Sequence, residues 1–202
     1  SALAQAGGKT PPVILGLLAV FFLVAALSGG MYIHISSALY SKGFTALKVS
    51  LLVSCFQAGT TLLQFIPGLL STRLKLKHIL DIVFPLTAVG AVLLVFLTPE
   101  FPFPLVMAAV FLVGGGRMFT ALDPLLARYV LGPEGFHRAY PRLQSIYLIG
   151  TAFTSIIYGG IYSATGTYSG SFWLMVGCMA VLLLLSHIVF ALADRGGKKT
   201  NA

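Results

Sequence analysis

The chain has 202 residues, of which 57% are hydrophobic and 9% are charged, and its mean hydropathy is +0.95. This composition excludes a water-soluble globule, because so few charged residues cannot cover its surface. The formal net charge of +8 fits contact with an anionic lipid leaflet. Nucleic acid is not an expected partner, since its binding needs a soluble basic face with exposed aromatic residues between the charges, which the sequence lacks.

Long apolar stretches follow one another along the chain. A helix needs roughly 20 apolar residues to cross a hydrocarbon core of ~30 Å. Stretches of this kind lie near 12–38, 46–70, 79–98, 104–127, 142–163 and 171–193. We therefore predict an all-α, multi-pass membrane protein with six transmembrane helices and the lipid bilayer as its solvent. Its expected parts are an N-terminal tail or linker (1–11), the six-helix bundle (12–193) and a basic tail (194–202).

Basic residues are distributed unequally between the two sides that six crossings define. The tails and the even-numbered gaps hold Lys9, Arg73, Lys75, Lys77, Arg128, Arg138, Arg142, Arg195, Lys198 and Lys199. The odd-numbered gaps hold only Lys42 and Lys48. By the positive-inside rule, both termini are predicted to be cytoplasmic, and we expect the protein in the plasma membrane.

Two predicted helices carry polar residues at helical spacing. The stripe of the second helix is Ser50, Ser54, Gln57, Thr61, Gln64 and Gly68, and that of the fifth is Gln144, Tyr147, Thr151, Ser155, Tyr158 and Tyr162. Such side chains can hold helices together by hydrogen bonds, worth perhaps ~0.6 kcal/mol each. Stripes this long favour instead the lining of a water-filled path. The third and sixth helices are almost uniformly apolar, which predicts positions facing lipid.

The first and fourth predicted helices each contain a glycine cluster in mid-span. The clusters are Gly29-Gly30, followed by Met31-Tyr32, and Gly114-Gly115-Gly116, followed by Arg117. We expect both helices to be weakened or broken there. The two clusters lie at matching places in three-helix units of opposite direction, which indicates an inverted 3+3 repeat. Close helix packing through small residues is the other interpretation.

Arg117 is predicted to lie slightly to the cytoplasmic side of mid-membrane. Placing a guanidinium there costs at least ~2.5–3.5 kcal/mol on insertion scales, so the side chain should face a cavity or a partner. An anionic solute would satisfy it, and so would a salt bridge, a cage of carbonyl groups or snorkelling to the interface. The acidic residues Asp81, Glu100, Asp123, Glu134 and Asp194 are all expected at helix ends or in loops, so no mid-membrane proton carrier is predicted.

A second charged feature is expected at the cytoplasmic ends of the second and fourth helices. Asp123-Pro124 could cap a following turn, or Asp123 could pair with Arg73 if the two helices adjoin. We predict the Arg73–Asp123 pair as a cytoplasmic gate.

Several motifs resemble the second six-helix half of the major facilitator superfamily. Segment 68–77 is similar to the loop signature G-x-x-x-D-R-x-G-R-K, keeping Gly68, Arg73 and Lys77 but not its acid or second glycine. A stronger match runs from Asp123-Pro124 to Gly132-Pro133-Glu134, then through Gly150 and from Tyr158-Gly159-Gly160 to Phe172. This part resembles organic-anion and monocarboxylate-type members, of which oxalate–formate antiporters are an example.

The resemblance implies a secondary active or facilitative transporter that works by alternating access. Helices 1, 2, 4 and 5 would line the path, and a second six-helix half, in the same chain or another subunit, would complete it. The charged residues that such carriers place in the equivalents of helices 2 and 5 are missing here. The resemblance therefore does not identify the solute of this chain. We expect a small solute, in particular an organic anion. The predicted solute-binding residues are Tyr32, Gln57, Thr61, Gln64, Arg117, Tyr147, Thr151 and Tyr158.

The sequence allows some functions other than transport by a two-half carrier and disfavours others. A non-transporting receptor or scaffold of the same fold, and a self-pairing half-transporter, are alternatives. An intramembrane protease is disfavoured because G-x-S-G is missing, and His34 and His187 are expected near opposite faces as ordinary interfacial residues. We therefore predict no enzyme. Cys55 and Cys178 lie inside apolar spans as small core residues, so neither a metal site nor a disulfide is expected, and no nucleotide-binding loop or cofactor is predicted.

Overall fold

A computed structural model describes residues 12–70 and 74–198 of the chain. All regular secondary structure in these ranges is helical. The elements are α2 (Pro12–Gly29), α3 (Met31–Ser41), α4 (Ala46–Leu70), α5 (Leu76–Phe96), α6 (Phe103–Gly115), the 3₁₀-helix η1 (Gly116–Met118), α7 (Phe119–Thr165) and α8 (Ser169–Lys198). The predicted all-α class is confirmed.

Five helical stretches of the described residues are long and apolar enough to cross a membrane. They are Pro12–Ser41, Ala46–Ile66, Leu76–Phe96, Phe103–Thr165 and Ser169–Asp194. Their composition agrees with a membrane protein, since each contains a window of mean hydropathy between 1.5 and 2.5.

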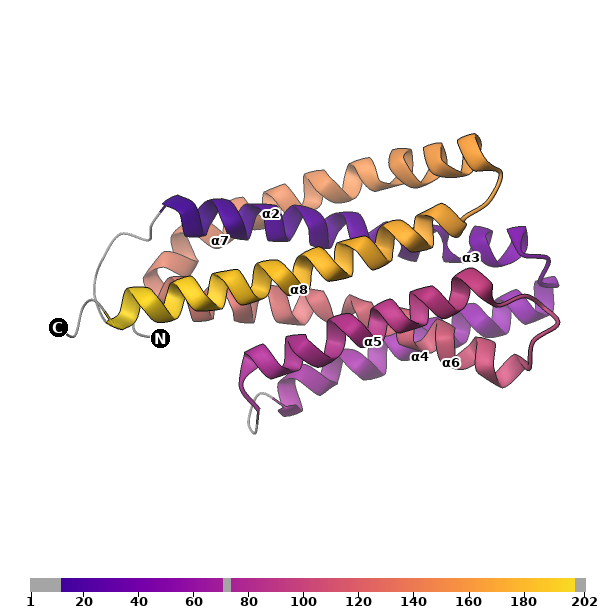
Figure 1. The fold of residues 1–202 in the computed structure, drawn as a ribbon, viewed down its shortest axis with the longest axis horizontal. Helices are drawn as coiled ribbons and strands as arrows, with labels where there is room; N and C mark the ends of the chain where they lie inside the picture. The colour runs from indigo at the N-terminus through magenta and orange to yellow at the C-terminus, as the bar shows by residue number, and fades with distance from the viewer. Residues whose placement is uncertain (1–11, 71–73, 199–202) are drawn as a thin grey trace.

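The Phe103–Thr165 stretch, 63 residues long, bends at Gly132. A straight helix of that length would measure roughly 95 Å at ~1.5 Å per residue. At Gly132 the backbone leaves the helical region, with φ 70° and ψ 174°, a conformation that favours glycine. Pro133 then starts the second part of α7, a position that suits proline because it needs no amide donor. Figure 1 shows α7 turning back at the end of the molecule where α2 begins and α8 ends.

Segment 128–141 lies between two of the predicted spans. Apart from Gly132, the segment is helical, because a single residue of positive φ suffices to turn the chain. The predicted third helix also differs slightly in its bounds: α5 begins at Leu76 instead of 79 and ends at Phe96 instead of 98.

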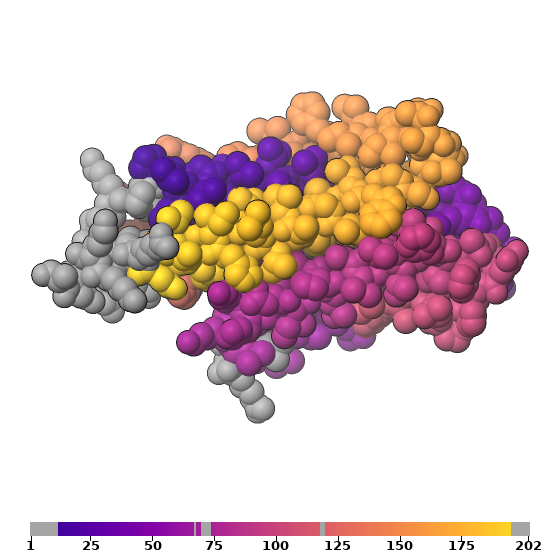
Figure 2. All heavy atoms as spheres, viewed as in Figure 1, coloured from indigo at the N-terminus to yellow at the C-terminus, as the bar shows by residue number. Residues whose placement is uncertain are grey.

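The packing of the bundle centres on α8, which contacts both α2 and α5. On the remaining sides α2 packs against α7, and α6 packs against both α4 and α5. Figures 1 and 2 show α8 running diagonally between α2 and α5. The core is apolar and partly aromatic, and its largest fully buried side chains include Phe21, Phe22, Phe84, Tyr158 and Phe172.

Both glycine clusters interrupt their helices, as predicted. The first interruption separates α2 from α3 at Gly30, and the second replaces α-helix by the 3₁₀ turn η1. The clusters also permit close packing. A methyl group added to Gly30 would lie 2.6 Å from Thr154 Cβ, and one added to Gly114 would collide with the carbonyl oxygen of Phe56. The clusters therefore both interrupt their helices and allow close packing.

The helix α4 is the least covered of the candidate spans. Only 22% of its most apolar window is buried, against 44% or more in each of the others. Large apolar side chains are exposed on α4, α5 and α8 alike. Those on α4 are Leu47, Leu51, Leu62, Phe65 and Leu69, those on α5 are Ile82, Leu86, Val89 and Phe96, and those on α8 are Trp173, Val181, Leu184 and Ile188. That the third and sixth helices face lipid stays a prediction.

Candidate functional site

Arg117 lies on η1, where the glycine cluster converts the end of α6 into a 3₁₀ turn. Its side chain is exposed, and its Cζ is 5.3 Å from the centroid of the Tyr32 ring on α3. This distance is within the range of a cation–π contact. The Tyr32 hydroxyl donates to the carbonyl oxygen of Val113 at 3.4 Å, which holds the ring over the turn.

The guanidinium of Arg117 has no acidic partner in the described ranges. The ion pairs found there join histidines to Asp81, on another part of the bundle. Of the roles open to Arg117 from sequence, a salt bridge is therefore not the one seen. An exposed cation over an aromatic ring can accept an anion on its open side.

Gln64 of α4 contacts the same turn through its side-chain amide. Its Nε2 is 3.4 Å from the Arg117 carbonyl oxygen and 3.4 Å from Thr120 Oγ1. Thr120 in turn donates to the Arg117 carbonyl at 2.9 Å. These bonds join α4 to η1 and hold the backbone that carries Arg117.

The other polar residues of α4 form an open face. Gln57 and Thr61, both predicted to bind solute, are exposed. Ser54 and Ser50, one and two turns before Gln57, are also exposed and donate to carbonyls of their own helix. The predicted stripe of the second helix therefore lies on the surface of this chain.

The polar stripe of α7 is largely turned inward. Tyr158 is fully buried, and its hydroxyl donates to the carbonyl oxygen of Leu27 at 3.1 Å. Thr151 donates to the carbonyl of Tyr147 at 2.9 Å, and both residues are half-buried. A Cβ atom added to Gly29 would lie 3.7 Å from the Tyr147 hydroxyl and 3.8 Å from the Tyr32 ring, so the two tyrosines lie close together. The structure thus brings Tyr32, Gln64, Arg117 and Tyr147 to one place but places Tyr158 inside the packed bundle.

Asp123 occupies an interior position that the sequence did not predict. It was expected at a helix end, either capping a turn or paired with Arg73, but it lies within α7, and only 4% of the residue is exposed. Its Oδ1 is buried without a hydrogen-bond partner. The proposed partner in the gate, Arg73, lies outside the described residues.

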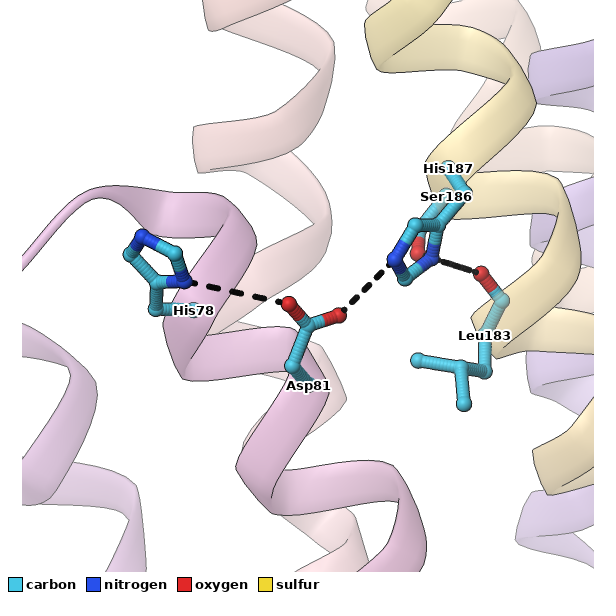
Figure 3. A network of polar contacts seen from close by, with 5 residues as sticks. All are labelled: His78, Asp81, Leu183, Ser186 and His187. Atoms are coloured by element: carbon cyan, nitrogen blue, oxygen red, sulfur yellow. Dashed lines mark hydrogen bonds and ion pairs between the residues drawn. The ribbon is translucent and has the colours of Figure 1, made fainter.

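A polar contact between α5 and α8 was not predicted from the sequence. Asp81 lies between two histidines, with Oδ1 3.3 Å from His187 Nε2 and Oδ2 3.9 Å from His78 Nδ1 (Figure 3). His187 was predicted to be an ordinary interfacial residue. The spacing of His78 and Asp81 on one helix face could have indicated the first contact, but no local pattern points to the second.

Histidine and cysteine chemistry is limited elsewhere. Cys55 Sγ donates to the Met107 carbonyl at 3.4 Å, and Cys178 is buried. Within residues 12–70 and 74–198, no group of three or more histidine, cysteine or acidic residues could hold a metal ion.

Comparison with known proteins leaves the family open: no family model, curated protein or solved structure matches this chain. A functional proposal therefore rests on the residues and contacts described above.

Proposed function

We propose that this chain is the carboxy-terminal six-helix half of a major facilitator-type transporter that moves a small organic anion by alternating access. The observation that carries the proposal is the position of Arg117, an exposed cation without an acidic partner, over Tyr32 and beside the open polar face of α4. An arginine at membrane depth is a candidate functional residue, and an exposed guanidinium without an acidic partner is suited to bind an anionic group.

Two equivalent sets of contacts at the helix interruptions support an inverted 3+3 repeat. At the interruption after α2, Tyr158 of α7 donates to the Leu27 carbonyl. At the interruption after α6, Thr60 of α4 donates to the Gly114 carbonyl at 3.2 Å. In the first case, the fifth proposed crossing supplies a hydroxyl to a carbonyl of the first crossing beside its interruption. In the second case, the second crossing supplies a hydroxyl to a carbonyl of the fourth. Under the repeat, the first crossing corresponds to the fourth and the second to the fifth. The symmetry therefore maps the bond between the fifth and first crossings onto the bond between the second and fourth.

Six crossings follow if the bend at Gly132 separates two of them. The crossings would be 12–41, 46–70, 76–96, 103–131, 133–165 and 169–198. Most Lys and Arg residues lie in the tails, between the second and third crossings, and near the ends of the crossings on either side of Gly132. By the positive-inside rule this distribution favours cytoplasmic termini, as expected of a plasma-membrane carrier.

The uncovered face of α4 supplies the surface for a second six-helix half. Gln57, Thr61 and the two serines of this face have no cover from the chain itself. Hydroxyl and amide groups facing lipid are costly. A facing half, in the same polypeptide or in another subunit, would cover this surface and enclose a polar path that includes Arg117.

Ligand-dependent thermal stability tests the proposal. The protein would be assembled in native-like lipid and heated with small mono- and dicarboxylates or with the matching neutral amides. A carboxylate at 100 times its dissociation constant should stabilise the fold by about 2.7 kcal/mol, and Arg117→Gln should abolish that effect. Arg128→Gln, which removes another exposed arginine of the same segment, is the matched control.

The outcomes separate the proposed function from its alternatives. Stabilisation by carboxylates together with uptake into vesicles supports a carrier. Stabilisation without uptake points to a receptor of the same fold. The proposal is overturned if no anion stabilises the protein, or if Arg117→Gln responds as the unaltered protein does.

A further inference from the structure

An apolar groove lies between α4 and α5, near the end of the bundle where α4 finishes and α5 begins. Both helices pack against α6 but scarcely touch each other, so a gap is left between them over the surface of α6. The groove is lined by Leu63 and Ile66 of α4, by Leu112 and Gly115 of α6, and by five residues of α5 from Ile79 to Thr87. Among these lining residues only Thr87 is polar.

The groove has a closed floor and an open rim. On α5, Ile79, Val83 and Thr87 are buried, whereas Ile82 and Leu86 are exposed. The lack of a side chain at Gly115 keeps the inner end open, because an added Cβ atom would collide with Leu63. The groove is therefore a slot that opens along α5 towards the surroundings of the bundle.

The length and the chemistry of this slot suit an acyl chain. From Ile79 to Thr87 it follows α5 for about 12 Å, at ~1.5 Å per residue. One acyl chain crosses half of a hydrocarbon core of ~30 Å, so the slot can hold most of a chain. A bound water needs roughly two to four polar partners, which this lining does not offer. The walls gain contacts only when apolar atoms fill the slot.

A positive charge lies at the end of the groove where α5 begins. Lys75 immediately precedes α5 and is exposed. It comes four positions before Ile79, so the two residues lie on the same side of the helix. The first turn of α5 contains no acidic residue, and Asp81, further along, is directed to His187 of α8. A cation at the end of an apolar slot is complementary to a lipid whose headgroup is negatively charged.

A second six-helix half on the open polar face of α4 would leave this groove accessible. Thr61 belongs to that polar face, and Leu63 follows it by two positions. At 3.6 residues per turn, two positions turn the side chain by about 200° around the helix. The groove and the polar face therefore lie on different sides of α4.

We propose that the groove is a specific binding site for one anionic phospholipid, with an acyl chain between α4 and α5 and the headgroup at Lys75. Under the topology proposed above, this lipid belongs to the cytoplasmic leaflet. The site does not depend on transport, because it rests on the groove and on the lysine at its end. A general attraction between basic residues and the membrane surface would not involve the groove, and the experiment separates the two.

Native mass spectrometry in mild detergent tests the site. The protein would be titrated with dioleoyl phosphatidylglycerol, with dioleoyl phosphatidylcholine and with inorganic phosphate. We expect one phosphatidylglycerol per chain, bound more tightly than phosphatidylcholine by about fivefold, the effect of one basic residue near an anionic lipid surface. Phosphate at the same concentration should not displace it, because phosphate has no chain to fill the groove. Equal binding of the two lipids, or displacement by phosphate, overturns the proposal.

Paired variants test the chain and the headgroup separately. Leu86→Trp fills the groove and should remove the bound lipid, whereas Val89→Trp, at an exposed position outside the lining of the groove, should retain it. Lys75→Gln should weaken binding about fivefold. Lys77→Gln removes the same charge from another side of that turn and should weaken binding less than about twofold. Either equal losses in the two lysine variants or retained binding in Leu86→Trp overturns the proposal.

Photocrosslinking of the unaltered protein keeps the test independent of how the variants fold. Phosphatidylglycerol with a photoreactive diazirine in one acyl chain would be added, and the crosslinked residues would be located by peptide sequencing. We expect crosslinks at Ile66, Ile82 and Leu86. Crosslinks that are as frequent at the exposed Val181 and Leu184 of α8 overturn the site. Anion binding is measured in neither experiment, so the failure of the lipid site and the failure of the proposed function are distinguishable.

Discussion

The carboxylate of Asp81 on α5 lies 3.3 Å from His187 Nε2 on α8 and joins two helices that are distant in sequence. The other ring nitrogen, Nδ1, is 2.9 Å from the carbonyl oxygen of Leu183. A carbonyl can only accept, so Nδ1 carries a proton. Asp81 Oδ1 makes no hydrogen bond, and its contact with His187 is an ion pair when the imidazole is charged.

This contact predicts a measurable contribution to stability. Asp81→Asn should lower the free energy of unfolding by up to about 1 kcal/mol, the range of a partly exposed ion pair. Thermal unfolding of the two proteins in the same lipid or detergent measures the difference. His78→Ala should have little effect, since that contact is longer and more exposed. An Asp81→Asn protein that is as stable as the original would contradict the ion pair.

The ring of Tyr32 is predicted to position Arg117. Tyr32→Phe keeps the aromatic face and should leave the carboxylate affinity within about threefold of its original value, since only a long hydrogen bond is lost. Tyr32→Leu removes the ring quadrupole and should weaken affinity by roughly tenfold, or about 1.4 kcal/mol. Carboxylate-dependent thermal stabilisation compares the two. Equal effects of both substitutions would show that the hydroxyl group, and not the ring, is what matters.

The close approach at Gly30 predicts a destabilising effect of a single added methyl group. Gly30→Ala would bring Cβ within 2.6 Å of Thr154 Cβ and 2.8 Å of Tyr158, at a cost of roughly 1–3 kcal/mol. The matched control is Gly160→Ala, which meets no atom within 4 Å and should be neutral or stabilise α7 by up to ~1 kcal/mol. Unfolding in the same lipid or detergent measures both. A stable Gly30→Ala protein would mean that α3 and α7 can separate there.

Hydroxyl groups at the two helix interruptions should have similar energetic importance. Tyr158→Phe removes the bond to the Leu27 carbonyl, and Thr60→Val removes the bond to the Gly114 carbonyl. Each should cost about 1 kcal/mol of stability, the usual net value of a buried hydrogen bond. Tyr162→Phe serves as a control, because Tyr162 is partly exposed and stacks on Tyr168. A large difference between the first two variants would argue against an inverted repeat.

The need for a second half predicts the mass of the functional unit. An epitope placed at Ala202 would be detected after denaturing electrophoresis of native membranes. We expect either a band at roughly twice 21.4 kDa, the mass of this chain, or a band near 21.4 kDa that doubles on crosslinking across the open face of α4. A band near 21.4 kDa that never doubles would exclude both the two-half carrier and the self-pairing one.

Helix positions were largely predictable because membrane spans are decided locally. A run of roughly 20 apolar residues has few other stable structures in lipid, so α4 and α8 lie close to their predicted bounds. The interruptions at Gly30 and Gly114–Gly116 were predictable for the same local reason, since glycine weakens a helix wherever it lies. The turn at Gly132 was not located, because 128–141 contains helix-forming residues and only one residue leaves the helix.

Side-chain partners were less predictable, because they depend on which helix faces which. Tyr158 continues a polar stripe in the sequence, yet it is buried, since the packing of α7 on α2 directs it to the Leu27 carbonyl. Asp123 precedes a proline and resembles a cap, yet the helix continues through it and the packing of the bundle encloses it.

The sequence by itself determined that the chain is helical and apolar, that Arg117 is the charge to be explained, and where two helices would be interrupted. These features depend on composition and on residues within a few turns of each other. Only the tertiary structure decided that Arg117 lies over Tyr32, that α4 keeps an open polar face, and that Asp81 meets His187. Each of these relationships joins segments far apart in the chain, and helix periodicity does not specify which helix packs against which.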